Sequence, residues 1–300
     1  MARFALVGTF SNGLIPLTTC IVNGALAYDN DVDIHLIGHQ DVPTDYLDQL
    51  DAVDRVVLTR WPDIVDSERQ RKSQSGVKRT GWELRFYRYR YIPRIADKYD
   101  AVLIMDTDMF IVGNFHKQME LAISSGELVM PQNPRGVPLR NILNGSWPLE
   151  KMSSAASPSL HNMPLFFVPS KWAWLMEEVY EWGLKEPYGD MVTLFKTVCR
   201  NNLAERVIQL NNDLWVFTDY YFDRMVMAED DQGRPMLTYK DERAIIVHRR
   251  WHMESVCRKF VEDVKQDHYR ENARHNVECF KRCIEWLTKK GPVHNPQLGD

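Results

Sequence analysis

The stretch that decides the fold is Ala101-Val102-Leu103-Ile104-Met105-Asp106-Thr107-Asp108-Met109-Phe110-Ile111-Val112. Five apolar residues, rich in strand formers, run without a charge into two carboxylates one residue apart, and a second apolar run follows at once. An uninterrupted apolar run of this kind predicts a strand that is buried on both faces. Two acids at the end of such a strand are costly unless something neutralises them.

The two acids, Asp106 and Asp108, predict a divalent metal site. Mg²⁺ and Mn²⁺ are hard cations that prefer carboxylate oxygens. In an open α/β sheet, ligands gather at the carboxyl ends of the strands, which is where these acids lie. The alternative is that both acids simply cap the strand and begin a turn. The length of the apolar run and its flanks favour the metal site.

Length and composition limit the classes of protein to consider. The 300 residues suffice for one large α/β domain or two small ones, and 44% apolar with 26% charged residues is an ordinary globular composition. A formal net charge of −4 argues mildly against a protein that coats nucleic acid or an acidic membrane.

The cysteines and the N-terminus predict a cytoplasmic protein without a membrane span. The five cysteines are odd in number and form no C-x-x-C motif, which fits a reducing compartment. The first residues lack the apolar region and the small-residue cleavage site of a signal peptide. No apolar stretch approaches the roughly 18 residues of a membrane-spanning helix.

Strands and helices alternate from the N-terminus. We expect strands over 4–8, 32–38 and 55–58, separated by helices over 16–28 and 45–50. This β-α-β-α-β order predicts a mainly parallel sheet with right-handed crossovers.

The second half continues the pattern with strands at 161–168, 206–210 and 244–247 and helices at 170–182 and 190–198. The first of these helices has a predicted core stripe of Trp174, Leu175, Val179 and Trp182. A charged amphipathic helix or helix pair over 253–290 forms a C-terminal extension, and residues 291–300 are expected to fray.

A basic and aromatic stretch over residues 77–94 precedes the Asp-x-Asp strand. Its cations alternate with aromatic residues: Lys78, Arg79, Arg85, Arg88, Arg90 and Arg94 with Trp82, Phe86, Tyr87, Tyr89 and Tyr91. Such a stretch could bind single-stranded nucleic acid, bring cations to a diphosphate bound at the next strand, or form a solvated helix face. The negative net charge makes the diphosphate the better of the two functional interpretations.

His248 ends the last predicted strand. Together with His252 it has the spacing of a zinc pair, but Arg249 stands where a metalloprotease carries its glutamate, so we reject that motif. His248 could be a third ligand for a metal held by Asp108, or a buried structural histidine. The sequence contains no G-x-S-x-G, P-loop or G-x-G-x-x-G motif.

Four segments, taken in order, resemble a known family. They are IPRIADKYDAVLIMDTD at 92–108, HNMPLFFVPSKW at 161–172, DMVTLF at 190–195 followed by VIQLN at 207–211, and AIIVH at 244–248. They are similar to motifs of the GT-A glycosyltransferases, specifically the retaining glycogenin-like and galactosyltransferase-like members of family eight. The resemblance implies a single Rossmann-like GT-A domain over 1–252, followed by the helical extension.

The resemblance also implies roles for particular residues. Asp106 and Asp108 would hold Mn²⁺ (or Mg²⁺) against the diphosphate of a nucleotide sugar, most simply a UDP-sugar, and His248 would complete the metal shell. The metal would act as a Lewis acid for the leaving diphosphate. For the donor, Thr9, Phe10 and Ser11 would contact the base, and Thr107 would lie beside Asp106, which would contact the ribose. Arg79, Arg85 or Arg88 would contact phosphate or donor sugar. Asn162 and Asp190, with Asp219 as the alternative to Asp190, would bind hydroxyls near the reacting carbon.

The predicted function is therefore a metal-dependent hexosyltransferase that retains the anomeric configuration. Its acceptor could be a glycan, a protein or a modified nucleic acid. One rival is a phosphatase of the haloacid-dehalogenase type, in which the first acid of a D-x-D is the nucleophile. That motif usually lies near the N-terminus, whereas here it lies a third of the way along the chain. The other rival is a nucleic-acid-binding protein that uses the stretch from Lys78 to Arg94.

Overall fold

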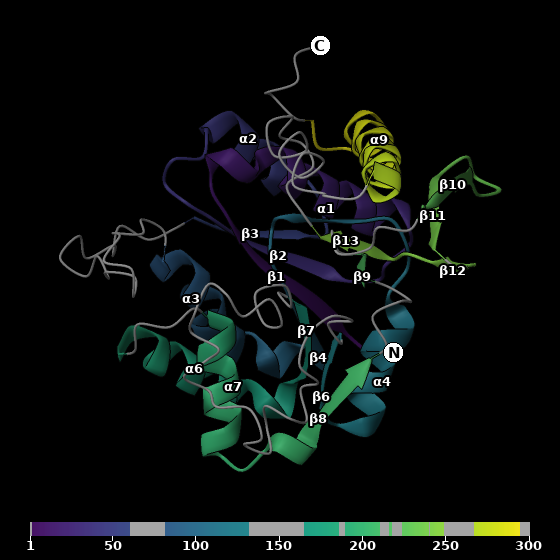
Figure 1. Ribbon diagram of the computed structural model, residues 1–300. Coiled ribbons are helices and arrows are strands. Elements are labelled where there is room, and N and C mark those ends of the chain that lie inside the picture. Colours follow the sequence, from purple (N-terminus) through teal and green to yellow (C-terminus); the bar gives the residue numbers. More distant parts are fainter. Residues whose placement is uncertain are drawn as a thin grey trace.

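A computed structural model describes residues 2–60, 82–131, 165–185, 190–210, 216–217, 224–239, 241–248 and 267–294. Within these residues the largest element is a seven-stranded sheet of order β3-β2-β1-β4-β7-β6-β8 (Figure 1). Its strands are β1 (Phe4–Phe10), β2 (Asp33–Gly38), β3 (Val56–Arg60), β4 (Ala101–Met105), β6 (Leu128–Pro131), β7 (Leu165–Pro169) and β8 (Val207–Leu210).

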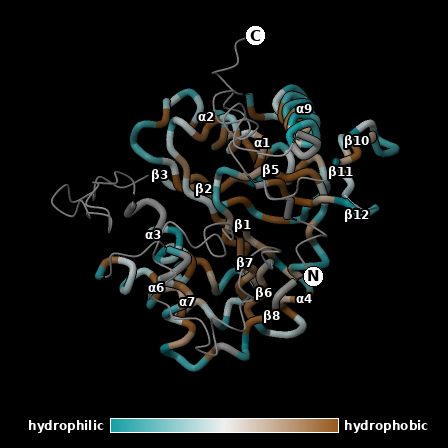
Figure 2. Tube along the Cα trace, viewed as in Figure 1, coloured by the Kyte–Doolittle hydropathy of each residue, from teal (hydrophilic) through white to brown (hydrophobic). Residues whose placement is uncertain are grey.

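The sheet is mainly parallel, as predicted. The pairs β1–β2, β2–β3, β1–β4 and β6–β8 are parallel, whereas β7 runs antiparallel to both β4 and β6. Every residue of β1 and of β4 is buried, which confirms that these uninterrupted apolar runs form central strands covered on both faces. The strands of this sheet carry mainly hydrophobic colours in Figure 2.

Helices cover both faces of the sheet. Leu6 and Leu103 point into a core shared with α1 (Ile15–Ala27) and α9 (Asp267–Lys290). Ala5, Val102 and Ile104 point into the opposite core, and the helices on that side are α3 (Trp82–Tyr91), α6 (Ala173–Lys185) and α7 (Asp190–Arg200). The predicted C-terminal helix is confirmed over 267–290, while 253–266 lie outside the described residues. No described helix is long and apolar enough to cross a membrane.

Two further helices have simple local causes. Helix α2 (Thr44–Asp51) starts after Pro43 and buries Tyr46, Leu47 and Leu50 at helical spacing. Helix α4 (His116–Ser125) was not predicted, and it ends at Gly126, whose φ of 65° lies in the left-handed region that favours glycine.

One sequence prediction about α6 is wrong. The predicted Leu175 and Val179 are buried, but Trp174 is 46% exposed and Trp182 is only partly buried, whereas Met176 and Tyr180 are buried in the same stripe. The stripe begins one position later than predicted because Trp172, in the short 3₁₀ turn before α6, already enters the core. The i, i+3, i+4 spacing from Trp172 then leaves Trp174 on the outer side of the helix.

Two small sheets complete the described structure. One consists of β5 (Met109–Ile111), β13 (Ile246–His248) and β9 (Val216–Phe217), with β13 antiparallel to β5 and Met109 opposite His248. The apolar run after Asp108 therefore enters a different sheet from the run before it. The other is a hairpin of β10 (Val226–Glu229) and β11 (Pro235–Tyr239) with β12 (Glu242–Arg243).

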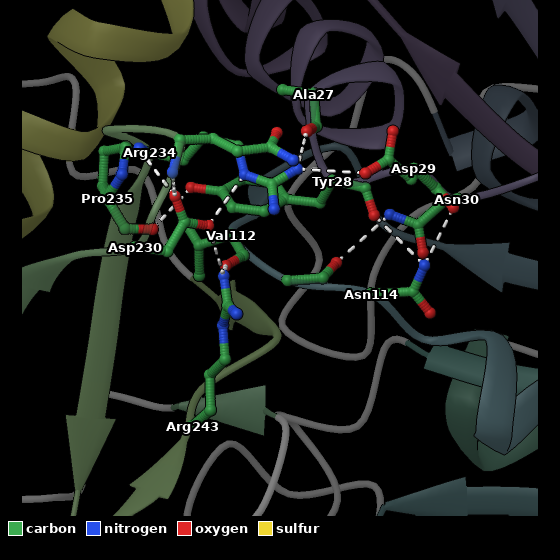
Figure 3. Close-up of polar contacts among 12 residues, drawn as sticks. Ala27, Tyr28, Asp29, Asn30, Val112, Asn114, Asp230, Arg234, Pro235 and Arg243 are labelled. Atoms are coloured by element: carbon green, nitrogen blue, oxygen red, sulfur yellow. Dashed lines mark hydrogen bonds and ion pairs between the residues drawn. The ribbon is translucent and has the colours of Figure 1, made fainter.

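Polar contacts fasten this hairpin to the C-terminal end of α1 (Figure 3). The Tyr28 hydroxyl donates to the Pro235 carbonyl at 2.6 Å, and Arg234 donates to the Ala27 carbonyl at 2.6 Å. Arg234 also pairs with Asp230 at 2.7 Å. The guanidinium thus satisfies a carbonyl that the end of a helix leaves unpaired. The chain continues from this hairpin into β13, so the same contacts help to fix the position of the segment that precedes β13.

The segment that follows α9 is held against α1 as far as Val293, so the expected fraying does not begin at residue 291. The Asn23 side chain on α1 donates to the carbonyls of Leu287 and Val293 at 2.8 Å each and accepts from the Val293 amide at 3.2 Å. Val293 is fully buried. The four cysteines that the structure describes, Cys20, Cys199, Cys279 and Cys283, carry free thiols.

Candidate functional site

The strand order reverses between β1 and β4. From β1 the chain moves to β2 and β3 on one side, and then returns to place β4 on the other side of β1. Ligands of open α/β sheets bind at such a switch point, outside the carboxyl ends of the strands. Thr9 and Phe10 end β1, and Asp106 follows directly after β4. The predicted base-binding and metal-binding residues therefore meet at one edge of the sheet.

Thr107 joins the two strand ends. Its hydroxyl donates to the Thr9 carbonyl at 2.7 Å, and the residue is only 4% exposed. A β-carbon on Gly8 would lie 3.2 Å from the Thr107 methyl group, so this close approach requires glycine or a shift of its neighbour. Thr107, the middle residue of the Asp-x-Asp motif, therefore holds the turn against the end of β1, and its hydroxyl donates its hydrogen bond within the protein.

Arg88 on α3 bridges two of the predicted site carboxylates. One of its terminal nitrogens donates to Asp106, the other to Asp190 at the start of α7, and Arg88 is 1% exposed. Burial acts to lower the pKa of Arg88, but the adjacent Asp106 and Asp190 outweigh it, so the pKa lies above the ordinary arginine value. Arg88 therefore stays a cation between two carboxylates.

Asp108 lies on the other side of the turn, and the strand pairing brings His248 near it. Asp108 immediately precedes β5, whose first residue, Met109, pairs with His248. This register places the backbone of His248 beside the residue that follows Asp108. The side chain of His248 lies outside the described part of the chain.

The charges of this site suit a hard cation. Asp106, Asp108 and Asp190 carry three negative charges, and Arg88 supplies one positive charge, which leaves a formal −2. The Asp106 side chain remains 30% exposed, so a ligand can reach it from solvent. The described side chains, which exclude that of His248, contain no group of three or more His, Cys, Asp or Glu close enough to hold a metal. A divalent ion held by the two acids of the motif would therefore need further ligands from outside these described side chains.

The end of β1 contributes mainly backbone groups to the candidate site. Phe10 is fully buried and packs edge-on against Tyr46, with ring centroids 6.2 Å apart, whereas Ser11 is half-buried. Two residues that the sequence analysis missed lie here. His39 donates its amide to the Phe10 carbonyl at 2.8 Å, and Asp41 accepts from the Asn12 amide at 3.1 Å. Their position directly after the predicted strand at 32–38 is the signal that could have found them.

The part of the basic and aromatic stretch whose side chains the structure describes, residues 86–94, is mostly interior. Helix α3 buries Phe86, Tyr87, Tyr89 and Tyr91, the rings that a nucleic-acid interpretation would expose for base stacking. Arg90 and Arg94 donate to the hydroxyls of Tyr180 (3.4 Å) and Tyr87 (3.3 Å).

Some predicted site residues receive no side-chain description. Arg85 lies within α3, but its side chain is outside the described part of the chain. Arg79, Asn162 and Asp219 lie outside the described residues altogether, and their predicted roles stay predictions. The site as the structure describes it therefore consists of Asp106, Thr107 and Asp108, joined by Arg88 to Asp190.

Comparison with known proteins identifies the fold. The sequence matches no protein-family model and no curated protein sequence. The bifunctional glycosyltransferase WbbM aligns with 94% of this chain at 11% identity and a TM-score of 0.54, and this chain spans 52% of its length. The galactosyltransferase LgtC, solved with donor and acceptor sugar analogs, aligns with 89% of this chain at 12% identity and a TM-score of 0.52, and 99% of its length is covered.

A third structure agrees with these two. The glycosyltransferase GlyE from Streptococcus pneumoniae TIGR4 aligns with 96% of this chain at 15% identity and a TM-score of 0.52, and this chain covers 64% of it. At these identities the likeness shows the fold alone. That fold is the one found in GT-A glycosyltransferases, as the four sequence segments implied.

Proposed function

We propose that the chain is a metal-dependent glycosyltransferase that moves a sugar from a nucleotide-sugar donor, a UDP-sugar, to an acceptor hydroxyl. The observation that carries the proposal is the Asp-x-Asp turn at the switch point of a GT-A fold, with Arg88 holding Asp106 to Asp190. The fold supports the reaction class, and the charge of the site supports a cation-bound diphosphate. The family resemblance in the sequence supports UDP and retention.

The proposed roles of the residues around the metal and the diphosphate follow from where they lie. Asp106 and Asp108, with His248, would hold Mn²⁺ or Mg²⁺, which when bound supplies Lewis-acid stabilisation of the charge on the leaving diphosphate. Thr107 keeps the turn against β1 through its bond to the Thr9 carbonyl. Arg79 and Arg85 are the proposed phosphate contacts.

The remaining roles concern the base and the reacting sugar. Thr9, Ser11 and the backbone of Phe10 border the position proposed for the base, because Thr9 and Phe10 end β1 beside the Asp-x-Asp turn and Ser11 follows directly. Asp190 and Asn162 are proposed to hydrogen-bond sugar hydroxyls near the reacting carbon. We assign no side-chain nucleophile. The acceptor, whether on a glycan, a protein or a modified nucleic acid, would approach from the Asp190 side.

Thermal unfolding with nucleotides tests the proposal. The chain is heated with UDP, GDP, CDP or ADP, each with and without Mn²⁺. A ligand that binds only the folded state stabilises it, by about 2.7 kcal/mol at 100 times its Kd. We expect the unfolding temperature to rise with UDP only when Mn²⁺ is present. This rise should vanish in Asp108→Asn.

The matched control is Asp51→Asn, which removes an exposed carboxylate at the end of α2, away from the site. This variant should keep the full shift. No shift with any nucleotide and metal pair would contradict the proposed site. In that case, hydrolysis of an aryl phosphate that depends on Asp106 would favour the phosphatase.

A further inference from the structure

Arg88 lies between Asp106 and Asp190, at the proposed site, and is buried away from solvent. One terminal nitrogen donates to Asp106 and also to the Met105 carbonyl at 3.3 Å, at the end of β4. The other terminal nitrogen donates to Asp190. With 1% of its surface exposed, the guanidinium lies away from solvent, so a donor phosphate would have to displace protein atoms to reach it.

Stability alone does not explain such an arrangement. Removing an ion from water costs several kcal/mol, and replacing buried ion pairs with apolar residues is often neutral or stabilising. What the planar guanidinium provides is direction, because its two ends bind two acceptors at fixed positions. Here the two acceptors belong to different elements, the β4 turn and helix α7.

The start of α7 contacts two consecutive residues of α3. Among the described residues, α7 also packs on α6, and α6 packs on α3. The first residue of α7, Asp190, also accepts a long bond of 3.5 Å from the Tyr89 hydroxyl. The Tyr89 ring in turn lies 5.3 Å from the Arg88 guanidinium carbon. The pair Arg88 and Tyr89 thereby joins the start of α7 to the Asp-x-Asp turn.

We propose that Arg88 is a positioning residue that sets Asp190 relative to Asp106, and that it does not bind the donor diphosphate. The inference rests on the proposed function, because it assumes that Asp106 serves the metal and diphosphate while Asp190 faces the transferred sugar. It is an alternative to the expectation, drawn from sequence, that Arg88 contacts phosphate or donor sugar. Loss of Arg88 should therefore impair the reaction step more than donor binding.

The test compares Arg88→Lys with Arg90→Lys, its neighbour on the same helix, which contacts Tyr180. Lysine keeps the charge but has a single ammonium group in place of the planar guanidinium, so it cannot hold the two carboxylates at the same fixed positions. UDP binding with Mn²⁺ is measured by calorimetry, and hydrolysis of UDP-sugar is measured with water as the acceptor. For Arg88→Lys we expect UDP affinity within about threefold of the unsubstituted chain, and a fall in kcat of about 100-fold, the loss typical of a 1 Å misplacement. Arg90→Lys should change neither.

Asp190→Asn provides a second variant that hardly changes the volume of the site. It should reproduce the loss of kcat with UDP affinity retained, and the double variant should lose no more than either single one, since the two residues act as a unit. A fall of tenfold or more in UDP affinity in Arg88→Lys, with UMP affinity unchanged, would overturn the positioning role of Arg88 but not the proposed function. Absence of Mn²⁺-dependent UDP binding in the unsubstituted chain would overturn the proposed function and this role with it.

Discussion

His35 shows how one buried residue can tie several elements together. It lies on β2 and is 3% exposed, with one ring nitrogen 2.8 Å from the Tyr99 hydroxyl and the other 3.1 Å from that of Tyr91. Tyr99 donates to Asp33, so it accepts from His35 Nε2–H, and Nδ1 accepts from Tyr91. Tyr91 ends α3, the helix that carries Arg88. The neutral imidazole therefore supports the helix that holds the site.

Acid should destabilise the protein through His35. Burial lowers its pKa to about 4, while Asp33 acts to raise it and Lys98 to lower it further. In the unfolded chain His35 takes up a proton near its ordinary pKa of 6.5, whereas in the folded chain it stays neutral at that pH. This contribution to stability is complete above pH 6.5 and is lost as the pH falls toward 4. It amounts to as much as about 3 kcal/mol.

Urea unfolding at pH 7 and pH 4.5 measures this effect. We expect the unsubstituted chain to lose about 2–3 kcal/mol more than His35→Gln over that interval, since all other titrating groups are common to both. Equal losses in the two proteins would show that His35 is protonated in the folded state at pH 4.5.

At the scale of elements, the packing of α1 on β5 joins the two sheets. Helix α1 follows β1, the central strand of the main sheet, while β5 belongs to the sheet that contains His248. Gly24 is the contact point, because a β-carbon there would collide with the carbonyl oxygen of Ile111. The absence of a side chain at this position thus lets the strand after Asp108 lie against the helix after β1.

Gly24→Ala should destabilise the protein although it lies inside a helix. Helix propensity alone favours alanine by about 1 kcal/mol. The new methyl group, however, meets backbone that cannot rotate away, and such overpacking typically costs about 1–3 kcal/mol. Gly13→Ala is the matched control, because a β-carbon there meets nothing within 4 Å. Chemical denaturation of both variants measures the difference, and a Gly24→Ala variant as stable as Gly13→Ala would contradict the packing.

For the molecule as a whole, the parts that sequence could predict are those with a strong local signal. The uninterrupted apolar runs of β1 and β4 and the spacing in α1 and α2 reflect burial and helical period, and these elements are confirmed. The Asp-x-Asp turn was found because acids after a buried strand are unusual. The turn over 229–235 has a local signal, but the strands β10 and β11 on either side of it do not, because they are short and the first is largely exposed, so it shows little apolar pattern.

The internal role of Arg88 could not be predicted from sequence. In the chain it is one of several arginines that alternate with aromatic residues, and nothing local separates it from Arg90. Only the packing of α3 against the end of β4 and the start of α7 decides which of them is enclosed between carboxylates. Exposure likewise distinguishes Trp174 from Trp172, although both lie in the same short stretch.

The central claim is that this fold uses Asp106 and Asp108 to hold a metal against a nucleotide-sugar diphosphate. The most direct measurement is ³¹P NMR of UDP-glucose, UDP-galactose and related UDP-sugars incubated with the protein and Mg²⁺, which, unlike Mn²⁺, does not broaden the phosphorus signals. We expect slow release of UDP from at least one donor, lost on addition of EDTA and in Asp108→Asn, and retained in Asp51→Asn. Release of UDP that continues without metal and in Asp108→Asn, or no release from any donor, would contradict it.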